Sequence, residues 1–468
     1  MKFYKKGDKK LLNAWAFYDW ANSVYPLVIS TAIFPIYWTI ITKSENINFL
    51  WFESIQNDAF ISYLSSITFI ILAFISPLLS GIADHTGQKK LFMQLFCYLG
   101  VISCLFLYFF GANHFNAGVF YYFFAIVGFW GSLVFYNSYL PDIANKKQQD
   151  LTSAKGYSLG YIGSTLLLIA ILFFVNFPQI FNINHNIYFA ELGAIETSSK
   201  IPIFGSFRLE YFLEPSYIKA MKLSFIFVGL WWFIFSQYSF YYLPGKTYYS
   251  QNKDKLFSYK ILLSGFNQIK VVFNELKENR SLKLFLFSFF IFTIPSQTII
   301  LLATYFGSDL NEIDWADEEA MKTGLIVAII VIQILAALGA YLSAKLSSIF
   351  GNFKTLIFVN LIWGAICLFG FFVKSPLEFY IAAAFIGLAM GGIQTLSRST
   401  YSKLIDSEDS TSYFGFYDFS QKLSIVLGTA LYGTMDLLLG NVRIAILLFA
   451  LFFIPSILLL IKLNYSKK

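Results

Sequence analysis

Apolar segments long enough to cross a lipid bilayer recur along the whole chain of 468 residues. A membrane-spanning helix needs about 20 mostly apolar residues. Twelve such windows lie near residues 15–41, 59–83, 91–111, 117–138, 156–177, 219–243, 281–306, 322–346, 354–373, 376–398, 412–435 and 442–462. Composition agrees, because 57% of the residues are hydrophobic and only 13% are charged, against about 25% charged residues in ordinary soluble chains. We therefore expect an all-α integral membrane protein with twelve transmembrane helices.

A polar stretch divides these windows into two sets of six. The division predicts an N-terminal six-helix bundle over residues 1–243, a cytoplasmic linker over 244–280 and a C-terminal six-helix bundle over 281–468. The turns after the second and the eighth window carry Gly87 and Gly351, which are 264 residues apart. Because the two halves run in the same direction, the pattern is typical of transporters built from two parallel six-helix repeats.

The distribution of basic residues predicts the orientation. Most of the 34 Lys and Arg fall at the two termini and in every second loop, and such an excess marks the cytoplasmic side. We expect both termini to be cytoplasmic and the protein to lie in a bacterial cytoplasmic (inner) membrane. The same inward bias explains the net charge of +7, so no nucleic-acid partner is needed.

Three cysteines lie inside apolar runs, at positions 97, 104 and 367. On a helix, the seven-residue spacing of Cys97 and Cys104 places their backbones about 10 Å apart, which is too far for a disulfide. We expect all three to be small core residues.

The loop after the second window has a recognisable pattern, Asp84-His-Thr-Gly87-Gln-Lys89-Lys90. A tight turn between two spans needs glycine at the bend, an acid that meets a helix N-terminus or a base, and cations at the lipid headgroups. Asp84, Gly87 and Lys89 match the signature Gly-x-x-x-Asp-Arg-x-Gly-Arg-Lys, and the loop resembles that of the major facilitator superfamily. The departures are Ser80, His85 and Gln88. The alternative is a short basic loop that obeys the charge rule and nothing more.

A narrower resemblance rests on strings spread over nearly the whole chain. They are Trp15-Ala-Phe-Tyr-Asp19-Trp-Ala-Asn22-Ser23, Asn137-Ser-Tyr-Leu-Pro141-Asp-Ile-Ala, Lys155-Gly156-Tyr-Ser-Leu-Gly160-Tyr161-Ile-Gly163, Gly229-Leu-Trp231-Trp232, Gly391-Gly392-Ile-Gln394-Thr-Leu-Ser397-Arg398-Ser399 and Phe414-Gly415-Phe-Tyr417. With them the chain is similar to the vacuolar amino-acid effluxer family and its bacterial relatives. The resemblance implies a major facilitator carrier, with amino-acid export known for the fungal members. One departure is Thr293-Ile-Pro295, where the family pattern has Asn-Asp-Gly.

Ionisable side chains inside apolar spans indicate function, because each costs at least about 2.5 kcal/mol at mid-membrane unless it faces a partner or water. Asp19, Asp418 and Lys422 are such residues, and we assign them a gate or coupling role. Two pairings are open. Asp418 and Lys422 are four residues apart on one helix face and can neutralise each other. Alternatively, Asp19 reaches from the first half to Lys422 in the second and closes a cytoplasmic gate.

Uncharged polar and aromatic side chains at helical spacing mark a candidate substrate cavity. We expect it to include Asn22, Trp130, Asn137, Gln297 and Gln394. Amides with few fixed charges suit a small polar or zwitterionic solute. The competing explanation is hydrogen bonding between helices, at about 0.6 kcal/mol per contact.

The expected function is transport of a small solute, amino acids first, by alternating access within membrane lipid. A proton carried by a carboxylate such as Asp19 is an optional second partner. We expect neither an enzyme nor a metal or other cofactor: Gly156-x-Ser158-x-Gly160 imitates a nucleophile elbow, but it opens a membrane span and only His185 follows it. The alternative is a non-transporting receptor or scaffold with the same fold.

Overall fold

A computed structural model describes most of the chain. The described residues are 5–42, 46–50, 52–55, 57–111, 114–181, 186–189, 198–202, 208–214, 216–245, 259–308, 313–405, 409–439 and 442–466.

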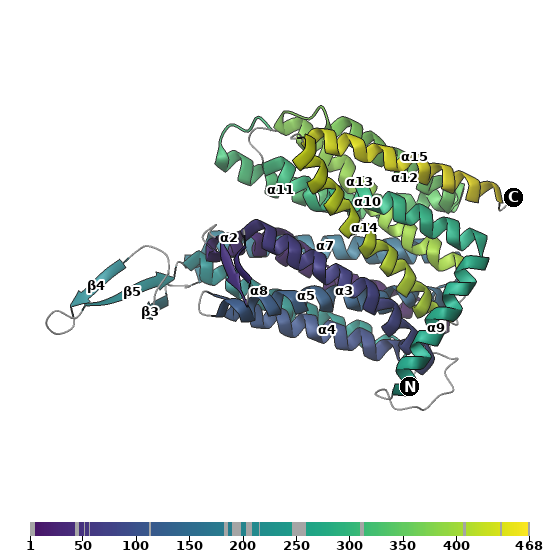
Figure 1. The fold of residues 1–468 in the computed structure, drawn as a ribbon, viewed down its shortest axis with the longest axis horizontal. Coiled ribbons are helices and arrows are strands. Elements are labelled where there is room, and N and C mark those ends of the chain that lie inside the picture. The colour runs from purple at the N-terminus through teal and green to yellow at the C-terminus, as the bar shows by residue number, and fades with distance from the viewer. Residues whose placement is uncertain are drawn as a thin grey trace.

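Long helices dominate the described residues (Figure 1). In the N-terminal half they are α1 (Lys9–Asn22), α2 (Phe34–Thr42), α3 (Asn57–Thr86), α4 (Lys89–Phe106), α5 (Phe115–Ser138), α6 (Leu140–Ile143), α7 (Gln149–Asn176) and α8 (Ser216–Tyr242). A connecting helix follows, α9 (Tyr259–Glu278). The C-terminal half contains α10 (Arg280–Ser308), α11 (Glu318–Phe350), α12 (Asn352–Gly370), α13 (Pro376–Leu404), α14 (Ser410–Leu439) and α15 (Val442–Ser466).

The helices form two bundles that lie side by side, one from each half of the chain (Figure 1). Both termini lie at the same end of the molecule (Figure 1). We call this the terminal end. Helices α3 and α7 of the first bundle contact α14, α11 and α13 of the second. Two helical bundles, one from each half, are what the sequence predicts.

Eleven helices of the described residues are long and apolar enough to span a membrane. The first of them runs from Lys9 to Thr42 and includes a π-helical segment, Tyr25–Ile33, between α1 and α2. Helix α14 is not among the eleven, although the sequence predicts a span at 412–435. Its 30 residues include Asp418 and Lys422. Twelve membrane crossings therefore remain a prediction. The prediction agrees with the position of both termini at one end, because that placement requires an even number of crossings.

Short-range signals explain where several helices begin and end. Asp317 caps α11 by accepting a hydrogen bond from the Ala320 backbone N–H at 2.7 Å. Gly87 and Gly351 separate α3 from α4 and α11 from α12, with φ of 65° and 86°. Both are left-handed values that glycine adopts without strain. The two halves thus use the same backbone device at positions 264 residues apart.

The structure is nearly all helical, and two short antiparallel sheets occur in connections between helices. The first pairs β1 (Ile47–Phe49) with β2 (Phe52–Ile55). In the second, β5 (Arg208–Glu214) lies between β3 (Asn186–Phe189) and β4 (Ser198–Pro202). This sheet projects from the end opposite the terminal end (Figure 1). Both sheets belong to connections between spans, where the apolar windows make no prediction.

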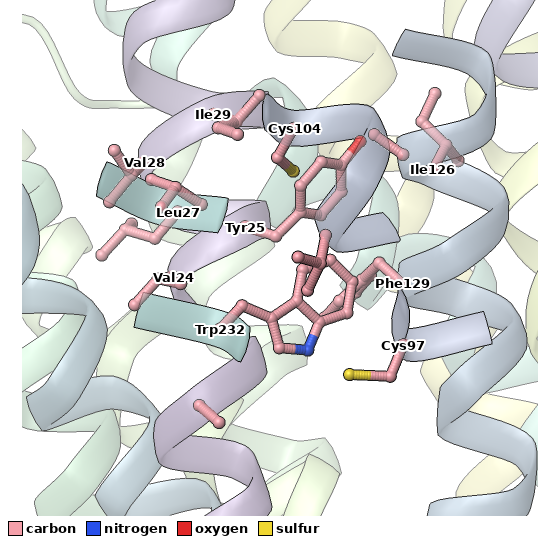
Figure 2. Packing of buried hydrophobic residues seen from close by; sticks show 14 of the residues in the cluster. Val24, Tyr25, Leu27, Val28, Ile29, Cys97, Cys104, Ile126, Phe129 and Trp232 are labelled. Atoms are coloured by element: carbon pink, nitrogen blue, oxygen red, sulfur yellow. The ribbon is translucent and has the colours of Figure 1, made fainter. Parts of the chain in front are cut away.

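The N-terminal bundle has an aromatic core in which two of the cysteines are buried. Figure 2 shows Cys97 and Cys104 beside Tyr25, Phe129 and Trp232. All three cysteines of the chain are free and buried. The expectation that they are core residues is confirmed.

Candidate functional site

The two bundles meet through buried charged residues, and one of these is Arg398 on α13. Only 1% of its surface is exposed. Its guanidinium contacts the Asp19 carboxylate of α1, with Nη1 at 3.3 Å and Nη2 at 3.4 Å from Oδ2. A cation of the C-terminal half is therefore neutralised by a carboxylate of the N-terminal half.

Further polar groups of the N-terminal half receive the remaining N–H groups of Arg398. Nε donates to the Ser153 hydroxyl at 3.0 Å, and Nη2 donates to the Ser153 carbonyl at 2.8 Å. Nη1 also donates to the Asn137 side-chain oxygen at 3.3 Å. Burial of an arginine is tolerated when its hydrogen-bonding groups find such partners.

Three aromatic rings surround the same guanidinium. Its central carbon lies 3.9 Å from the ring centroid of Tyr157, 4.8 Å from that of Trp15 and 5.5 Å from that of Tyr136. Cations are attracted to ring faces within about 6 Å. We call the six side chains that hold Arg398 the cage. They are Trp15, Asp19, Tyr136, Asn137, Ser153 and Tyr157.

Local geometry fixes Asp19 in the cage. The Tyr136 hydroxyl donates to Asp19 Oδ2 at 2.8 Å, and the Trp15 indole N–H donates to the Tyr136 carbonyl at 2.8 Å. Gly156 on α7 leaves the necessary space, because a Cβ at this position would lie 2.5 Å from Asp19 Oδ2 and 3.1 Å from Arg398 Nη2. Glycine at position 156 therefore lets α7 approach the charge pair closely.

Lys422 has a different partner from the one the gate hypothesis gave it. Its ammonium pairs with Asp418, four residues earlier on α14, and donates to the Ser76 hydroxyl of α3 at 3.3 Å. It also lies 6.0 Å from the ring centroid of Trp130. The predicted pairing of Asp19 with Lys422 is therefore wrong for this conformation. Lys422 pairs with Asp418, four residues away on the same helix, and Asp19 pairs with Arg398.

The loop motif binds the start of α14. Asp84 accepts from the backbone N–H of Thr411 at 3.2 Å and from that of Ser412. Lys89 pairs with Asp142, and its ammonium also donates to the Ser410 hydroxyl at 2.9 Å. A carboxylate at a helix N-terminus is stabilised by the unsatisfied N–H groups there. Gly87 supplies the turn that positions both charges.

A second set of contacts joins α7 to the C-terminal bundle near the turn between α11 and α12. Asp150 pairs with Lys403 and accepts from the Ser347 hydroxyl at 3.0 Å and from the Asn352 amide at 2.8 Å. These partners come from α13, α11 and α12. The two bundles are thus tied at two places, through α3 with α14 and through α7 with α11 to α13.

The five predicted cavity residues are not all in one place. Asn137 belongs to the cage, and Gln394 accepts a hydrogen bond from the Tyr161 hydroxyl of α7 at 2.7 Å. Trp130 lies at the Lys422 pair. Asn22 and Gln297 are 1% and 9% exposed, and the Asn22 amide nitrogen has no hydrogen-bond partner among the described residues.

A separate apolar pocket of about 60 Å³ lies within the C-terminal bundle. It is lined by α10 to α15, including Ile299, Phe306, Phe379 and Phe449. None of the predicted cavity residues lines it. Among the described residues there is no group of three or more metal-ligand side chains.

The sequence patterns do not single out Arg398, Asp150 or Asp142 as site residues. Arg398 stands at the last residue of the predicted span 376–398, although it follows Gln394 by one helical turn. The spacing of one helical turn from Gln394 is the sequence signal that could have identified Arg398 as a site residue. Ser158 donates to the Ala337 carbonyl at 2.8 Å, a contact between helices. His185 lies outside the described residues.

Comparison with known proteins shows the family to which this chain belongs. The family profile described as vacuole effluxer Atg22 like matches residues 7–208 and 207–468. The chain belongs to this family. The Bacillus subtilis protein named uncharacterized MFS-type transporter YxiO is 29% identical over 449 residues, which cover 96% of this chain and 93% of that protein.

Fungal members are more distant. Autophagy-related protein 22-1 of Penicillium rubens is 23% identical over 474 residues, covering 88% of this chain and 77% of that protein. The Saccharomyces cerevisiae protein (strain S288c) named autophagy-related protein 22 is 23% identical over 267 residues and is matched over 49% of its length.

Solved structures show the fold. The fucose transporter FucP in its outward conformation matches with a TM-score of 0.62 at 15% identity, covering 97% of this chain and 98% of that one. A bacterial homologue of ferroportin in its outward-facing state matches with a TM-score of 0.61 at 12% identity, covering 98% and 99%. The Atg22-like chain is thus an integral membrane transporter of the major facilitator superfamily. The expectation that it is not an enzyme is confirmed, because its relatives are transporters.

Proposed function

We propose that this Atg22-like protein carries a small polar or zwitterionic solute, with amino acids as the first candidates, across a membrane by alternating access. The observation that carries the proposal is the burial of Arg398 of one bundle inside the other. A charge that bridges two bundles gives them a closed state which can be opened only by exchanging its partners. Fixed packing between bundles would need no such charge.

The assignment of the terminal end to the cytoplasm is part of this proposal. It rests on the excess of Lys and Arg at the termini and at the loops on that end. With this orientation the structure is closed toward the cytoplasm by the cage, the Asp84 contacts and the Asp150 contacts. Helix α14 then serves as the twelfth span, with its buried charges paired within the protein and away from lipid.

Amino acids are proposed as cargo because the resemblance to the vacuolar effluxer family implies amino-acid export, and because the predicted cavity residues are mainly amides. The proton is the second proposed partner, with Asp19 as its carrier. Proton coupling predicts that a pH gradient drives net flux by wild-type protein and has less effect on Asp19→Asn.

Counterflow in proteoliposomes tests transport directly. Ligands that bind the folded protein raise its melting temperature, so a thermal-shift screen of amino acids, peptides, sugars and nucleosides first selects a solute. Vesicles preloaded with that unlabelled solute are expected to accumulate the labelled form transiently, while protein-free vesicles do not. Binding without counterflow would overturn the proposal and favour the receptor or scaffold alternative.

A further inference from the structure

The cage belongs to one half of the protein, whereas its occupant belongs to the other. Hydrogen-bond acceptors of Arg398 come from Asp19 of α1, Asn137 of α5 and Ser153 of α7. The three rings around it also lie on α1, α5 and α7. If α13 withdraws, this binding site stays behind complete in the N-terminal bundle.

What stays behind is a site for a cation. It holds one carboxylate, an amide oxygen, a backbone carbonyl and three ring faces, and each of these attracts positive charge. A buried carboxylate without a partner is costly in a membrane protein. When Arg398 leaves, water, a proton or another cation must take its place beside Asp19.

We propose that the cage is also the recognition site for the cationic nitrogen of the transported solute, a guanidinium or a primary ammonium group. This inference rests on the proposed transport function. Because Arg398 and the solute nitrogen occupy the same space, the solute binds only while the bundles are apart at the terminal end. Return of Arg398 expels the solute nitrogen from the cage and closes that end.

Competition with a built-in ligand has a measurable consequence. A protein whose binding-competent state is only partly populated binds with an affinity reduced by that fraction. Removing the Arg398 side chain empties the cage permanently, so a small cation should bind Arg398→Ala more tightly than it binds wild-type protein. Asp19 supplies the only carboxylate of the cage, so the gain should depend on it.

The test uses purified full-length protein and two probes of equal size, ethylguanidinium chloride and neutral ethylurea, at constant ionic strength. Ethylguanidinium is expected to raise the melting temperature of Arg398→Ala with a Kd at least about tenfold below that for wild type. Ethylurea should have no effect. The gain should disappear in the double variant Arg398→Ala, Asp19→Asn.

Lys322→Ala is the control, because it removes a cation of the C-terminal half whose ion-pair partner, Glu318, lies on the same helix, and it leaves the cage and the contacts between the bundles in place. It should respond like wild type. Equal responses to the two probes, no response of folded Arg398→Ala, or a gain that survives Asp19→Asn would overturn the inference. No response would mean that a proton neutralises Asp19 and that the cage only holds the gate.

A second measurement covers the case in which Arg398→Ala does not fold. Ethylguanidinium should inhibit counterflow by wild-type protein, and ethylurea should not; equal inhibition would contradict the inference. The two proposals fail separately. Counterflow with no cation selectivity removes only the role of the cage, whereas cation-selective binding without counterflow of any solute removes the transport function.

Discussion

At the scale of single residues, the partner of each buried charge decides its role. Asp418 and Lys422 lie on one helix, so their mutual attraction survives any rigid movement of the bundles. Asp19 and Arg398 lie on different bundles, so their attraction exists only in a state that brings the bundles together. Only the second pair can distinguish one state of a transporter from another.

Double-mutant cycles check this distinction. Asp19→Asn or Arg398→Gln alone leaves a buried charge without its partner, which costs about 3–5 kcal/mol. The double variant should be less destabilised than the sum of the two single variants, because it leaves neither charge. Combining Asp19→Asn with Lys422→Gln should be additive within about 0.5 kcal/mol. The measurement is unfolding free energy in mixed micelles; coupling of Asp19 to Lys422 and not to Arg398 would restore the original gate hypothesis.

At the scale of elements, the connecting helix α9 bridges the helices that tie the bundles together. It packs against α3 where Gly265 meets Gly81, and against α14 where the ring of Phe273 stacks on Phe416. Glu275 of α9 accepts a hydrogen bond from the Tyr413 hydroxyl of α14. The predicted linker over 244–280 therefore does more than connect the two bundles, because its helix α9 packs against both α3 and α14 and so forms a brace between them.

Gly81→Ala tests the brace. A Cβ at Gly81 would lie 2.7 Å from the backbone oxygen of Gly265, so α9 must move away. Overpacking of this kind costs about 1–3 kcal/mol, and hydrogen exchange of the α9 amides should accelerate accordingly. Gly364→Ala is the control, since its Cβ would meet only Phe453 at 4.0 Å. Unchanged α9 exchange in Gly81→Ala would show that the contact does not hold the helix.

At the scale of the whole molecule, two sets of contacts close the terminal end at once. One joins α3 to α14 and the other joins α7 to α11 and α13. Both must separate if that end is to open, so a covalent link at either place should hold the molecule in one state. The first offers a suitable position, because a Cβ at Gly415 would lie 3.1 Å from that of Ser80.

The double variant Ser80→Cys, Gly415→Cys provides such a link. Disulfides have Cβ atoms about 3.5–4.5 Å apart, so a small adjustment allows the bond. Oxidation should stop counterflow and reduction should restore it, while either single-cysteine variant stays insensitive to oxidant. The three native cysteines are buried, which limits competing reactions. Counterflow that continues in a fully cross-linked sample would contradict alternating access through this end.

The sequence by itself determined that this protein lies in lipid and that it is built from membrane-spanning helices. Bilayer thickness fixes the length of an apolar span, so windows of about 20 residues reveal the spans without any tertiary information. Gly87 and Gly351 revealed the repeat for a similar reason, since a left-handed turn favours glycine wherever it occurs. Asp418 and Lys422 could also be paired from sequence as one alternative, because helical spacing alone brings residues four apart together.

Only the tertiary structure decided which charge crosses between the bundles. Asp19 and Arg398 are 379 residues apart, and no periodicity relates positions on separate helices of separate halves. Their meeting depends on how α1, α5 and α7 pack around one point and on which turn of α13 faces it. Sequence patterns encode the face and the depth of a side chain along its own helix, whereas the partner across an interface is set by the packing of the two bundles.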